Sequence, residues 1–264
     1  MIIGVSGKIG SGKDTVGKII QYLTDKNRAG YTNPDSERDY NDYCKSIFKG
    51  KANWQIKKFA DKLKECISII TGISREDLEK EEIKSSMLGE EWAYYSILNT
   101  GENKYERFSY TKEYSFPSLP YKFPVRQLLQ EFGTEVGRQI HPNFWVNALF
   151  NEYKAIIDNT KIDWKNQDKA NKSIKENLIY PNWIITDVRF PNELKAVKDR
   201  DGITIRCNRD IENWGDAIKQ ITNDKHPSET ALDNATFNYT IDNNGTIEEL
   251  IEKVKEILIK EKII

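Results

Sequence analysis

Short apolar segments are followed by amphipathic segments in the first quarter of the chain. Ile2 to Val5 is apolar and β-branched, and a glycine-rich turn separates it from a helical pattern over Thr15 to Leu23. This order predicts a buried strand, a loop and a helix. A second strand is predicted over Gln55 to Ala60, and a helix over Asp61 to Thr71 follows it directly. Gly72 is the expected end of that helix.

The same alternation returns in the last third of the chain. Three strands and two helices are predicted there, and the turn before the second helix supplies its N-cap. These elements are strands over Trp183 to Thr186, Ile203 to Ile205 and Tyr239 to Ile241, and helices over Asn192 to Lys198 and Ile247 to Ile259. Strands that alternate with helices imply an α/β fold with a parallel sheet, in which ligands bind at the carboxyl ends of the strands.

The middle of the chain is less regular. Helices are predicted over Val125 to Ile140 and Phe144 to Ile157, whereas Gly89 to Phe123 is tyrosine-rich and predicts an insertion with a hairpin near the substrate. We therefore expect one domain over residues 1–264, with an inserted lid or substrate-binding region at about 72–124. The polar stretches 27–53 and 159–180 carry no recognisable motif, and only a short helix near Tyr40 to Phe48 is expected in the first.

The segment from Gly7 to Lys13 carries the strongest chemical signal. It matches the pattern G-x-x-x-x-G-K between a predicted strand and a predicted helix, which is the setting of a phosphate-binding loop. Gly10 and Gly12 permit a turn whose N–H groups surround a β-phosphate, and Lys13 is expected to reach the β- and γ-phosphates of ATP. The predicted ATP-binding residues are Gly10, Ser11, Gly12, Lys13, Asp14 and Thr15.

The residue after the loop lysine departs from the common pattern. That position is usually Ser or Thr, whose hydroxyl binds Mg²⁺, but here it is Asp14, with Thr15 next. Either Thr15 or a water held by Asp14 is the candidate for contact with Mg²⁺, and the sequence does not decide between them.

A second carboxylate ends an apolar segment. Asp187 follows the strand predicted to end at Thr186. A carboxylate at this position in a phosphate-loop fold can hold Mg²⁺ directly or through water, or it can accept a hydrogen bond from substrate. The alternative is that Asp187 is only a turn residue. Arg189 either contacts a phosphate or pairs with Glu193. Both sets of alternatives stay open.

Polar residues recur every four positions in the helix predicted from Val125. The stripe consists of Arg126, Gln130, Thr134 and Arg138. Its two arginines suit the dispersed charge of two facing phosphates, and Gly133 and Gly137 would let a ligand or another backbone approach. Apolar residues on a different side are expected to anchor the helix to the core; they are Leu129, Phe132, Val136 and Ile140. The alternative is a solvated face with Glu131 and Glu135 as partners.

Three further residues give weaker signals. Asp61 and Lys64 follow the second strand, where nucleotide kinases often hold the acceptor, but a helix cap and a surface charge explain them equally well. Trp145 is suited to stacking on a base, although an aromatic residue at helical spacing is more often part of the core.

Charge and composition narrow the class of partner. The chain has a net charge of −1 and three cysteines without metal-type spacing, which argues against a nucleic-acid polymer and favours reduced thiols. There is no signal-peptide pattern and no apolar run of about 20 residues. We therefore expect a cytoplasmic protein without a membrane partner, in the host cytoplasm if a phage encodes it.

Several segments together resemble the phage-type deoxynucleoside monophosphate kinases, and they keep their order along nearly the whole chain. The segments are Ser11–Thr15, Phe59–Lys64, Phe132–Arg138, Asn143–Val146, Ile185–Glu193, His226–Glu229 and Ile241–Leu250. The Phe-Gly-Thr-Glu and Thr-Asp-Val-Arg-Phe stretches within them are far more specific than the phosphate loop alone.

The resemblance implies a compact nucleoside-monophosphate-kinase-like fold and transfer of the γ-phosphoryl group of ATP to a deoxynucleoside monophosphate. It also implies an acceptor pocket lined by Arg126, Glu135, Arg138, Trp145 and Asp187. Within this hypothesis the catalytic residues are Lys13, Arg126, Arg138 and Asp187, and the two arginines of the stripe bridge the acceptor phosphate and the γ-phosphate.

Two other functions are compatible with a phosphate loop. One is a kinase of another small phosphorylated metabolite, such as a coenzyme precursor or phosphomevalonate. The other is a nucleotide-binding, DNA-associated protein with weak ATPase activity, which the near-zero net charge disfavours. The accepted bases, the choice between deoxyribose and ribose, and assembly as a homodimer are left open by the sequence.

Overall fold

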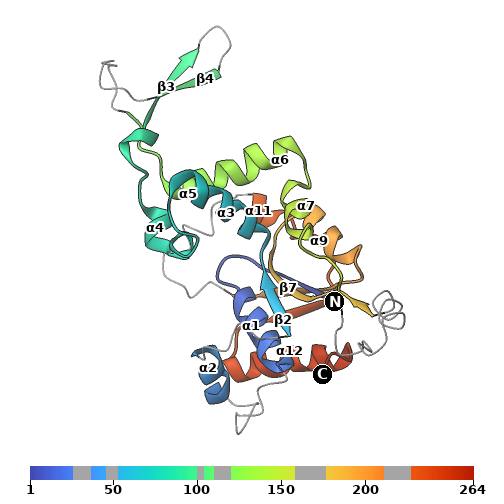
Figure 1. Ribbon diagram of the computed structural model, residues 1–264. Helices are drawn as coiled ribbons and strands as arrows, with labels where there is room; N and C mark the ends of the chain where they lie inside the picture. The colour runs from blue at the N-terminus through green and yellow to red at the C-terminus, as the bar shows by residue number, and fades with distance from the viewer. Residues whose placement is uncertain (26–36, 46–52, 100–103, 110–119, 158–176, 211–226) are drawn as a thin grey trace, which may run out of the picture. The chain divides into compact units, whose positions relative to one another are not determined.

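The computed structural model describes residues 1–25, 37–45, 53–99, 104–109, 120–157, 177–210 and 227–264 (Figure 1). Two compact units are present. The first unit comprises Met1–Phe59 and Val146–Ile264, and the second comprises Ala60–Trp145. The predicted insertion at about 72–124 lies within the second unit. Most of the polar stretches 27–53 and 159–180 lies outside the described residues, as does His226.

The first unit is built on a five-stranded sheet. Its order is β2 (Trp54–Lys57), β7 (Asn182–Val188), β1 (Ile2–Ser6), β8 (Ile203–Asn208) and β9 (Tyr239–Asp242), and every neighbouring pair is parallel. The α/β fold with a parallel sheet is therefore confirmed. Because β1 is central, the loop that follows it emerges in the middle of the carboxyl edge, where such sheets bind ligands.

Helices cover both faces of this sheet. α1 (Lys13–Thr24) and α12 (Ile247–Lys260) pack on one face, and α9 (Pro191–Lys198) packs on the other together with the end of α7 (Phe144–Phe150) (Figure 1). β1 and β7 contribute residues to both cores, as expected for strands buried on both faces, whereas the core residues of β2, β8 and β9 lie on the α1 side. The result is a three-layer arrangement, and α2 (Glu37–Lys45) adds two tyrosines to the α1 side.

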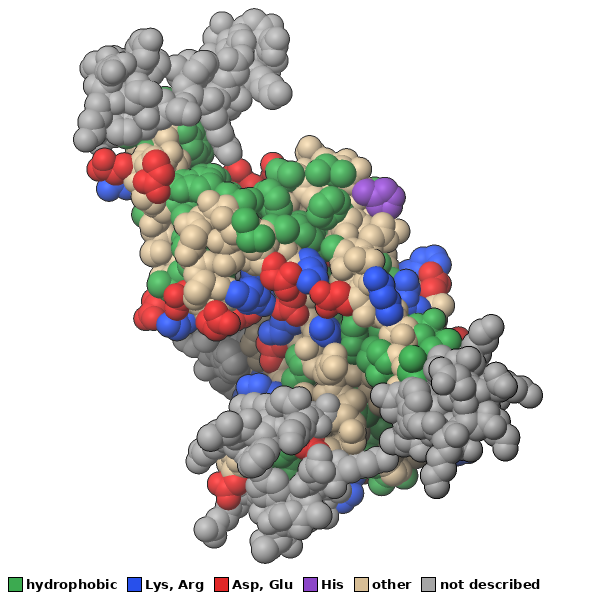
Figure 2. Space-filling view, viewed as in Figure 1, with side chains coloured by type: hydrophobic (Ala, Val, Ile, Leu, Met, Phe, Trp, Pro, Cys, Tyr) green, Lys and Arg blue, Asp and Glu red, His purple; other side chains and the backbone are tan. Residues whose placement is uncertain are grey.

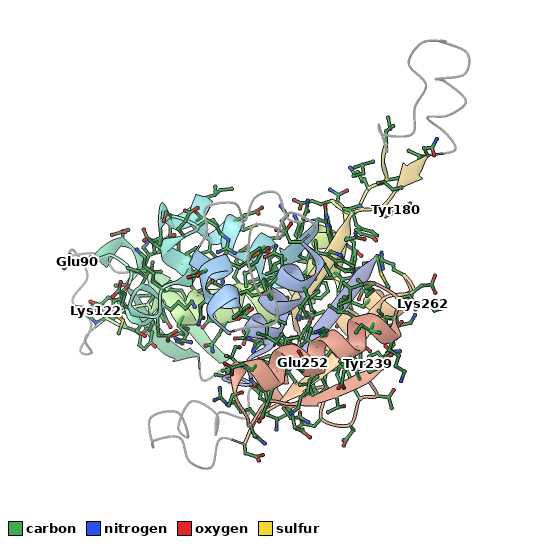
Figure 3. The ribbon with its side chains drawn as sticks, turned by 90° about the horizontal axis from the view of Figure 1, so that it is seen from below. Glu90, Lys122, Tyr180, Tyr239, Glu252 and Lys262 are labelled. Atoms are coloured by element: carbon green, nitrogen blue, oxygen red, sulfur yellow. The ribbon has the colours of Figure 1, made fainter. Side chains whose placement is uncertain are left out.

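The C-terminal helix is capped as the sequence predicts. The Thr246 side chain accepts a hydrogen bond from the Glu249 backbone N–H at 3.3 Å. Figure 3 shows Glu252 on this helix, Lys262 just past its end and Tyr239 on the neighbouring strand. The Tyr239 hydroxyl donates a hydrogen bond to Glu261 at 2.5 Å, so the helix end is joined to the edge strand β9.

Two predicted boundaries of the first unit are wrong. The second strand ends at Lys57 rather than Ala60, because α3 (Phe59–Thr71) begins two residues before the predicted helix start. The predicted helix over Phe144 to Ile157 ends at Phe150, and Ile156–Ile157 forms β5, which pairs antiparallel with β6 (Leu178–Ile179).

The second unit contains most of α3 and a series of short elements. These are η3 (Asp77–Glu79), α4 (Glu81–Ser85), η4 (Glu90–Trp92) and the antiparallel hairpin of β3 (Tyr94–Asn99) and β4 (Lys104–Ser109). A hairpin is thus present in the tyrosine-rich stretch, as expected. The unit has its own small core, formed by Ile67, Leu78, Phe123, Val125 and Leu128.

The helix predicted from Val125 to Ile140 contains a π-helical turn. It consists of α5 (Val125–Glu131), η5 (Phe132–Val136) and α6 (Gly137–Ile140), and the Gly137 N–H bonds to the Phe132 carbonyl five residues earlier. A π turn rotates the residues that follow it relative to those before it. Two of the four predicted anchors are consequently wrong, because Val136 and Ile140 are 45% and 67% exposed.

The described surface carries both signs of charge. On the face drawn in Figure 2, Lys and Arg side chains lie among Asp and Glu side chains, in keeping with the net charge of −1. Among the described residues, no helix is long and apolar enough to cross a membrane.

Candidate active site

The loop between β1 and α1 depends on two glycines with positive φ. Gly10 has φ 77° and Gly12 has φ 91°, a conformation that residues with a Cβ rarely adopt. A Cβ placed on Gly12 would lie 2.3 Å from Asn243 Nδ2, so space as well as backbone geometry requires glycine there. The predicted use of the glycines in a tight loop is therefore matched by the structure.

The ends of two neighbouring strands hold this loop. The Ser11 carbonyl accepts a hydrogen bond from Asn243 Nδ2 at 2.9 Å and another from Cys207 Sγ at 3.0 Å. Burial raises the pKa of the Cys207 thiol to about 11, which keeps the proton on sulfur as the hydrogen-bond donor at neutral pH. Neither residue is predicted individually from the sequence, because both lie more than 190 positions away from Ser11 along the chain.

Lys13 begins α1 and is almost fully buried. Its side chain bends back to the Lys8 carbonyl, with Nζ 3.2 Å from the oxygen. Burial lowers the pKa of Lys13, and the Arg189 guanidinium lowers it further, while nearby carboxylates oppose the shift. Lys13 and Arg189 therefore lie close enough to repel one another at this end of the sheet. A phosphate bound between them would reduce this repulsion.

A buried hydroxyl of the loop has an unused hydrogen-bonding capacity. Ser11 is 3% exposed, and its Oγ has no hydrogen-bond partner among the described residues. Buried polar groups are rarely left unsatisfied in folded proteins. The loop therefore fits a phosphate ligand, whose oxygens would accept from this hydroxyl and from the backbone N–H groups.

Asp14 is engaged by two residues of the first unit. Its Oδ1 accepts a hydrogen bond from Thr186 Oγ1 at 2.8 Å and lies 3.0 Å from Lys58 Nζ. Burial alone would raise the pKa of Asp14, but the Lys58 charge and the Thr186 hydrogen bond outweigh it and hold the pKa below its ordinary value. Asp14 is thus a carboxylate at neutral pH, and neither of its partners is predicted from the sequence.

The oxygen ligands near the loop suit Mg²⁺. Asp14, Thr15 and Asp187 offer hard oxygen donors of the kind that this ion prefers. Among the described residues, His, Cys, Asp and Glu form no group of three or more arranged for a metal. Mg²⁺ usually takes one or two protein carboxylates and completes its shell with phosphate and water, so a full protein cage is not required.

Asp187 and Arg189 are both fixed by hydrogen bonds in the first unit. Asp187 is 8% exposed and accepts the Phe59 N–H at 2.8 Å, which secures the first residue of α3. The Arg189 guanidinium pairs with Glu229 at 2.5 Å, a partner that neither predicted alternative included. Glu193 instead accepts the backbone N–H of Arg189 at 2.8 Å, at the start of α9.

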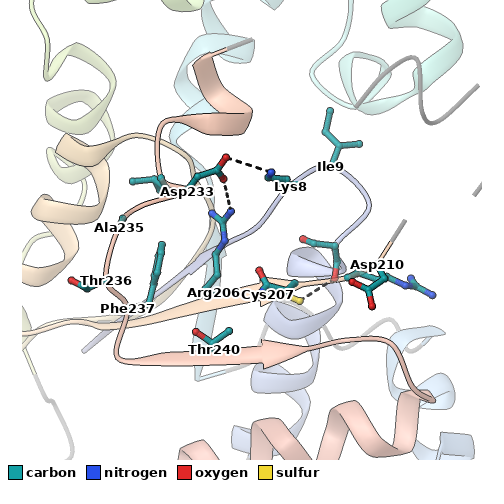
Figure 4. Close-up of a pocket in the computed structure, with 14 residues that line it drawn as sticks. Lys8, Ile9, Arg206, Cys207, Asp210, Asp233, Ala235, Thr236, Phe237 and Thr240 are labelled. Atoms are coloured by element: carbon teal, nitrogen blue, oxygen red, sulfur yellow. Dashed lines mark hydrogen bonds and ion pairs between the residues drawn. The ribbon is translucent and has the colours of Figure 1, made fainter. Parts of the chain in front are cut away.

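A cavity of about 770 Å³ lies beside the loop (Figure 4). Lys8 and Ile9 border it on the loop side, and β8 and the segment 232–237 supply most of the remainder. Arg206 is held at its wall by Ser6 at 3.1 Å and by Asp233 at 3.2 Å. Asp233 also pairs with Lys8 at 3.4 Å, so a single carboxylate links the loop to β8.

Residues of the polar stripe make contacts within the second unit. Arg126 forms an ion pair with Glu81, and Thr134 Oγ1 donates to the Gln130 carbonyl at 2.6 Å. Gln130 and Glu135 are exposed, and Arg138 is half-buried. The predicted stripe residues thus remain at or near the surface of one helical segment, although the π turn between Glu131 and Gly137 alters their spacing.

The glycines of this segment make room for side chains. A Cβ on Gly133 would lie 2.9 Å from Leu63, and one on Gly137 would lie 2.8 Å from the Trp145 ring. Trp145 is 4% exposed, and its Nε1 donates to the Gly133 carbonyl at 2.7 Å. These glycines therefore give room to the side chains of Leu63 and Trp145, and not to the ligand or backbone predicted from the sequence.

Asp61 and Lys64 belong to a network of four charged residues. Arg75 pairs with Asp61 and with Glu79 at 2.5 Å each, and Lys64 pairs with Glu79 at 2.6 Å. Partial burial would raise the pKa of Glu79, yet the bonds from Lys64 and Arg75 lower it to about 2. Contact of Asp61 and Lys64 with the acceptor stays a prediction, since each of them has a charged partner within the second unit.

Comparison with known proteins agrees with this chemistry. A family model described as "Deoxynucleotide monophosphate kinase" matches residues 1–254. The chain is also 26% identical over 264 residues to the deoxynucleoside-5'-monophosphate kinase of Escherichia phage T5, and the match spans 88% of this chain and 85% of that protein. The family match covers nearly the whole chain, including the phosphate loop and the polar stripe. The chain belongs to the deoxynucleotide monophosphate kinase family and is a phosphotransferase.

Proposed function

We propose that this kinase uses ATP as its donor and Mg²⁺ as its metal, and converts a deoxynucleoside monophosphate and ATP to the diphosphate and ADP. The observation that carries the choice of donor is the loop at the end of β1. Its two glycines have positive φ, its lysine is buried at the start of α1, and the hydroxyl of Ser11 is buried without a partner among the described residues.

On the donor side, the residues of the loop have separate roles. The backbone N–H groups of the loop from Gly10 to Thr15 and the Ser11 hydroxyl bind the β-phosphate, as the N-terminus of a helix favours. Lys13 exchanges the Lys8 carbonyl for the β- and γ-phosphates and stabilises the charge of the transition state. Arg189 contributes a second cation, which its electrostatic effect on Lys13 supports.

The residues for Mg²⁺ are Asp14, Thr15 and Asp187. Bound Mg²⁺ would neutralise charge on the β- and γ-phosphate oxygens. Asp14 is ionised, and Lys58 and Thr186 fix its position, so a water held by its carboxylate is the contact that we favour. Asp187, whose Oδ1 accepts from the Phe59 N–H, is the second carboxylate that we assign to a metal-bound water or to substrate.

On the acceptor side, we assign the phosphate of the deoxynucleotide to the two arginines of the stripe. Arg126 and Arg138 offer planar donors that match phosphate oxygens, and Arg126 is 43% exposed despite its ion pair. The remaining proposed acceptor residues are Asp61, Lys64, Gln130, Thr134, Glu135 and Trp145. Trp145 acts through packing, because its ring is buried against Gly137.

The chemistry needs positioning more than acid–base catalysis. An oxygen of the acceptor monophosphate is already anionic at neutral pH, so it attacks the γ-phosphorus without a strong general base. A bond forms between that oxygen and phosphorus, the bond to the β–γ bridging oxygen breaks, and ADP leaves with that electron pair. Lys13 and the arginines stabilise the negative charge throughout.

A coupled ADP-release assay tests this proposal. The full chain is incubated with ATP and Mg²⁺, and each deoxynucleoside and nucleoside monophosphate is added in turn. We expect strong ADP release with one or a few deoxynucleotides and a low rate without acceptor. ADP release at the acceptor-free rate for every nucleotide would overturn the proposal. Replacing Mg²⁺ by EDTA should abolish the acceptor-dependent rate.

A further inference from the structure

The Glu229 carboxylate joins two parts of the first unit that the sequence separates widely. It lies on the short helix α11 (Pro227–Thr230), and its side chain is only 9% exposed. Oε2 accepts the backbone N–H of Ile9 in the phosphate loop at 2.9 Å, and Oε1 accepts from Nη1 of Arg189 at 2.5 Å. The partners are 220 and 40 residues away along the chain.

The two contacts use both oxygens of one carboxylate. A nearly buried carboxylate that accepts one backbone N–H and one guanidinium N–H makes strong, directional bonds. The Ser228 hydroxyl adds a longer contact to the same guanidinium nitrogen at 3.4 Å. The side chain of Arg189, which is 31% exposed, is thereby held toward the loop rather than left to sample solvent.

Other nearby carboxylates do not duplicate this arrangement. Glu193 accepts the backbone N–H groups of Arg189 and Phe190, so it stabilises the start of α9. Asp233 pairs with Lys8 and Arg206 on the side of the loop that borders the cavity (Figure 4). Among these three acidic residues, the contacts described here connect only Glu229 to both the loop backbone and the Arg189 guanidinium.

Removal of Glu229 would have two physical consequences. The Ile9 N–H would lose a charged acceptor, and Arg189 would lose the anion that offsets its repulsion from Lys13. The guanidinium would then move away from Lys13, because two cations without an intervening anion repel one another. The loop would keep its glycines and its contacts with Asn243 and Cys207, so it would still fold.

We propose that Glu229 is a positioning residue for phosphoryl transfer, which acts by holding Arg189 and the Ile9 end of the phosphate loop in one fixed arrangement. The proposal rests on the kinase function proposed above. Glu229 does not touch the transferred group; its effect reaches the reaction through the guanidinium of Arg189. Small displacements of such a group are costly because phosphoryl transfer depends on placement.

The test compares four variants of the full chain in the ADP-release assay: Glu229→Gln, Arg189→Ala, the double variant and Asp199→Asn. Glu229→Gln retains an acceptor for Ile9 but removes the ion pair with Arg189. We expect kcat to fall by about ten- to a hundredfold, with KM for ATP within about threefold of the wild type. The double variant should be no slower than Arg189→Ala alone, since Glu229 acts through that residue.

Asp199→Asn is the matched control. It removes one negative charge from the first unit and the ion pair with Lys195 at the end of α9, but it leaves both Glu229 contacts intact. We expect its kcat to stay within about twofold of the wild type. An equal loss in Asp199→Asn and Glu229→Gln would overturn the proposal, because the effect would then be one of general charge.

Two further outcomes would also overturn the proposal. One is an unchanged kcat in Glu229→Gln, and the other is a double variant that is slower than Arg189→Ala by the full Glu229→Gln factor. If Glu229→Gln fails to fold, Glu229→Asp replaces it, because its shorter side chain keeps the charge but cannot span both partners. A wild-type rate for Glu229→Asp would contradict the proposal. An inactive wild-type chain would instead refute the kinase function itself.

Discussion

The phosphate loop and the polar stripe present their functional groups in different ways. The loop uses backbone N–H groups and a lysine that is 8% exposed. The Ser11 carbonyl is held by Cys207 and Asn243, and the lysine bends back to the Lys8 carbonyl. The stripe uses long side chains such as Arg126, which is 43% exposed and paired with a surface glutamate. The phosphate-binding N–H groups of the loop can be predicted from the spacing of its glycines. The direction of side chains on a helix cannot be predicted in the same way, because a π turn changes the helical register.

The largest expected effect concerns the loop. In Lys13→Met, we expect kcat to fall by about a thousandfold, because the buried cation that stabilises the transferring phosphoryl group is lost. The readout is acceptor-dependent ADP release, with thermal unfolding as the check on folding. Lys18→Met, on the exposed side of the same helix, should retain wild-type turnover. A Lys13→Met enzyme that is less than about tenfold slower would contradict the assignment of the loop.

The stripe is tested by Arg126→Ala and Arg138→Ala. If they bind the acceptor phosphate, kcat/KM for the deoxynucleotide should fall by about a hundredfold in each variant, while KM for ATP changes little. Lys84→Ala is the comparison, because Lys84 lies 4.0 Å from the same Glu81 that pairs with Arg126. Equal effects in Arg126→Ala and Lys84→Ala would mean that the stripe is a solvated face.

Gly137→Ala separates packing from ligand binding within the stripe. Its new Cβ would lie 2.8 Å from the Trp145 ring, so the free energy of unfolding should fall by about 1–3 kcal/mol through overpacking. Urea denaturation measures this change. Adding Trp145→Phe should recover part of the loss, since the smaller ring vacates the space. Full stability combined with lost activity would instead place a ligand at Gly137.

The smallest expected effect is the pH dependence of the network around Glu79. Its pKa is about 2 in the folded chain, against 4.5 ordinarily, so its stabilising contribution is complete above about pH 4.5 and is lost as the pH falls toward 2. The side chain is 43% exposed, and screening reduces the contribution to about 1 kcal/mol. Wild type and Glu79→Gln should therefore differ in unfolding free energy at neutral pH and converge at the acidic end. A constant difference would argue against the ion pairs.

Features of the fold that depend on neighbouring residues could be predicted from the sequence. All five strands of the sheet and the loop glycines follow from short patterns of apolar residues and glycine. The contacts that complete the site are not local: Cys207 and Asn243 reach Ser11, and Glu229 reaches Ile9, from positions near the other end of the chain. No periodicity marks such partners, because they are selected by the topology of the sheet.

The π turn could not be predicted from the sequence either. Phe132 to Val136 contains a glycine and two β-branched residues, which lower helix propensity but do not indicate a π turn. The Gly133 carbonyl within this turn accepts a hydrogen bond from Trp145 Nε1, a partner 12 residues later in the chain. The predicted four-residue spacing therefore identified polar residues that lie at or near the surface. It did not identify correctly which apolar residues face the core, because Val136 and Ile140 are exposed.

The central position of β1 has a consequence for synthesis of the protein. Both neighbours of this N-terminal strand begin at least 180 residues later, with β7 at Asn182 and β8 at Ile203. A chain emerging from the ribosome must wait for these segments before β1 can pair, and for Asn243 before the Ser11 carbonyl acquires that bond. Incomplete nascent chains therefore carry the motif but not the finished phosphate loop, and truncated products of translation should be unable to bind nucleotide.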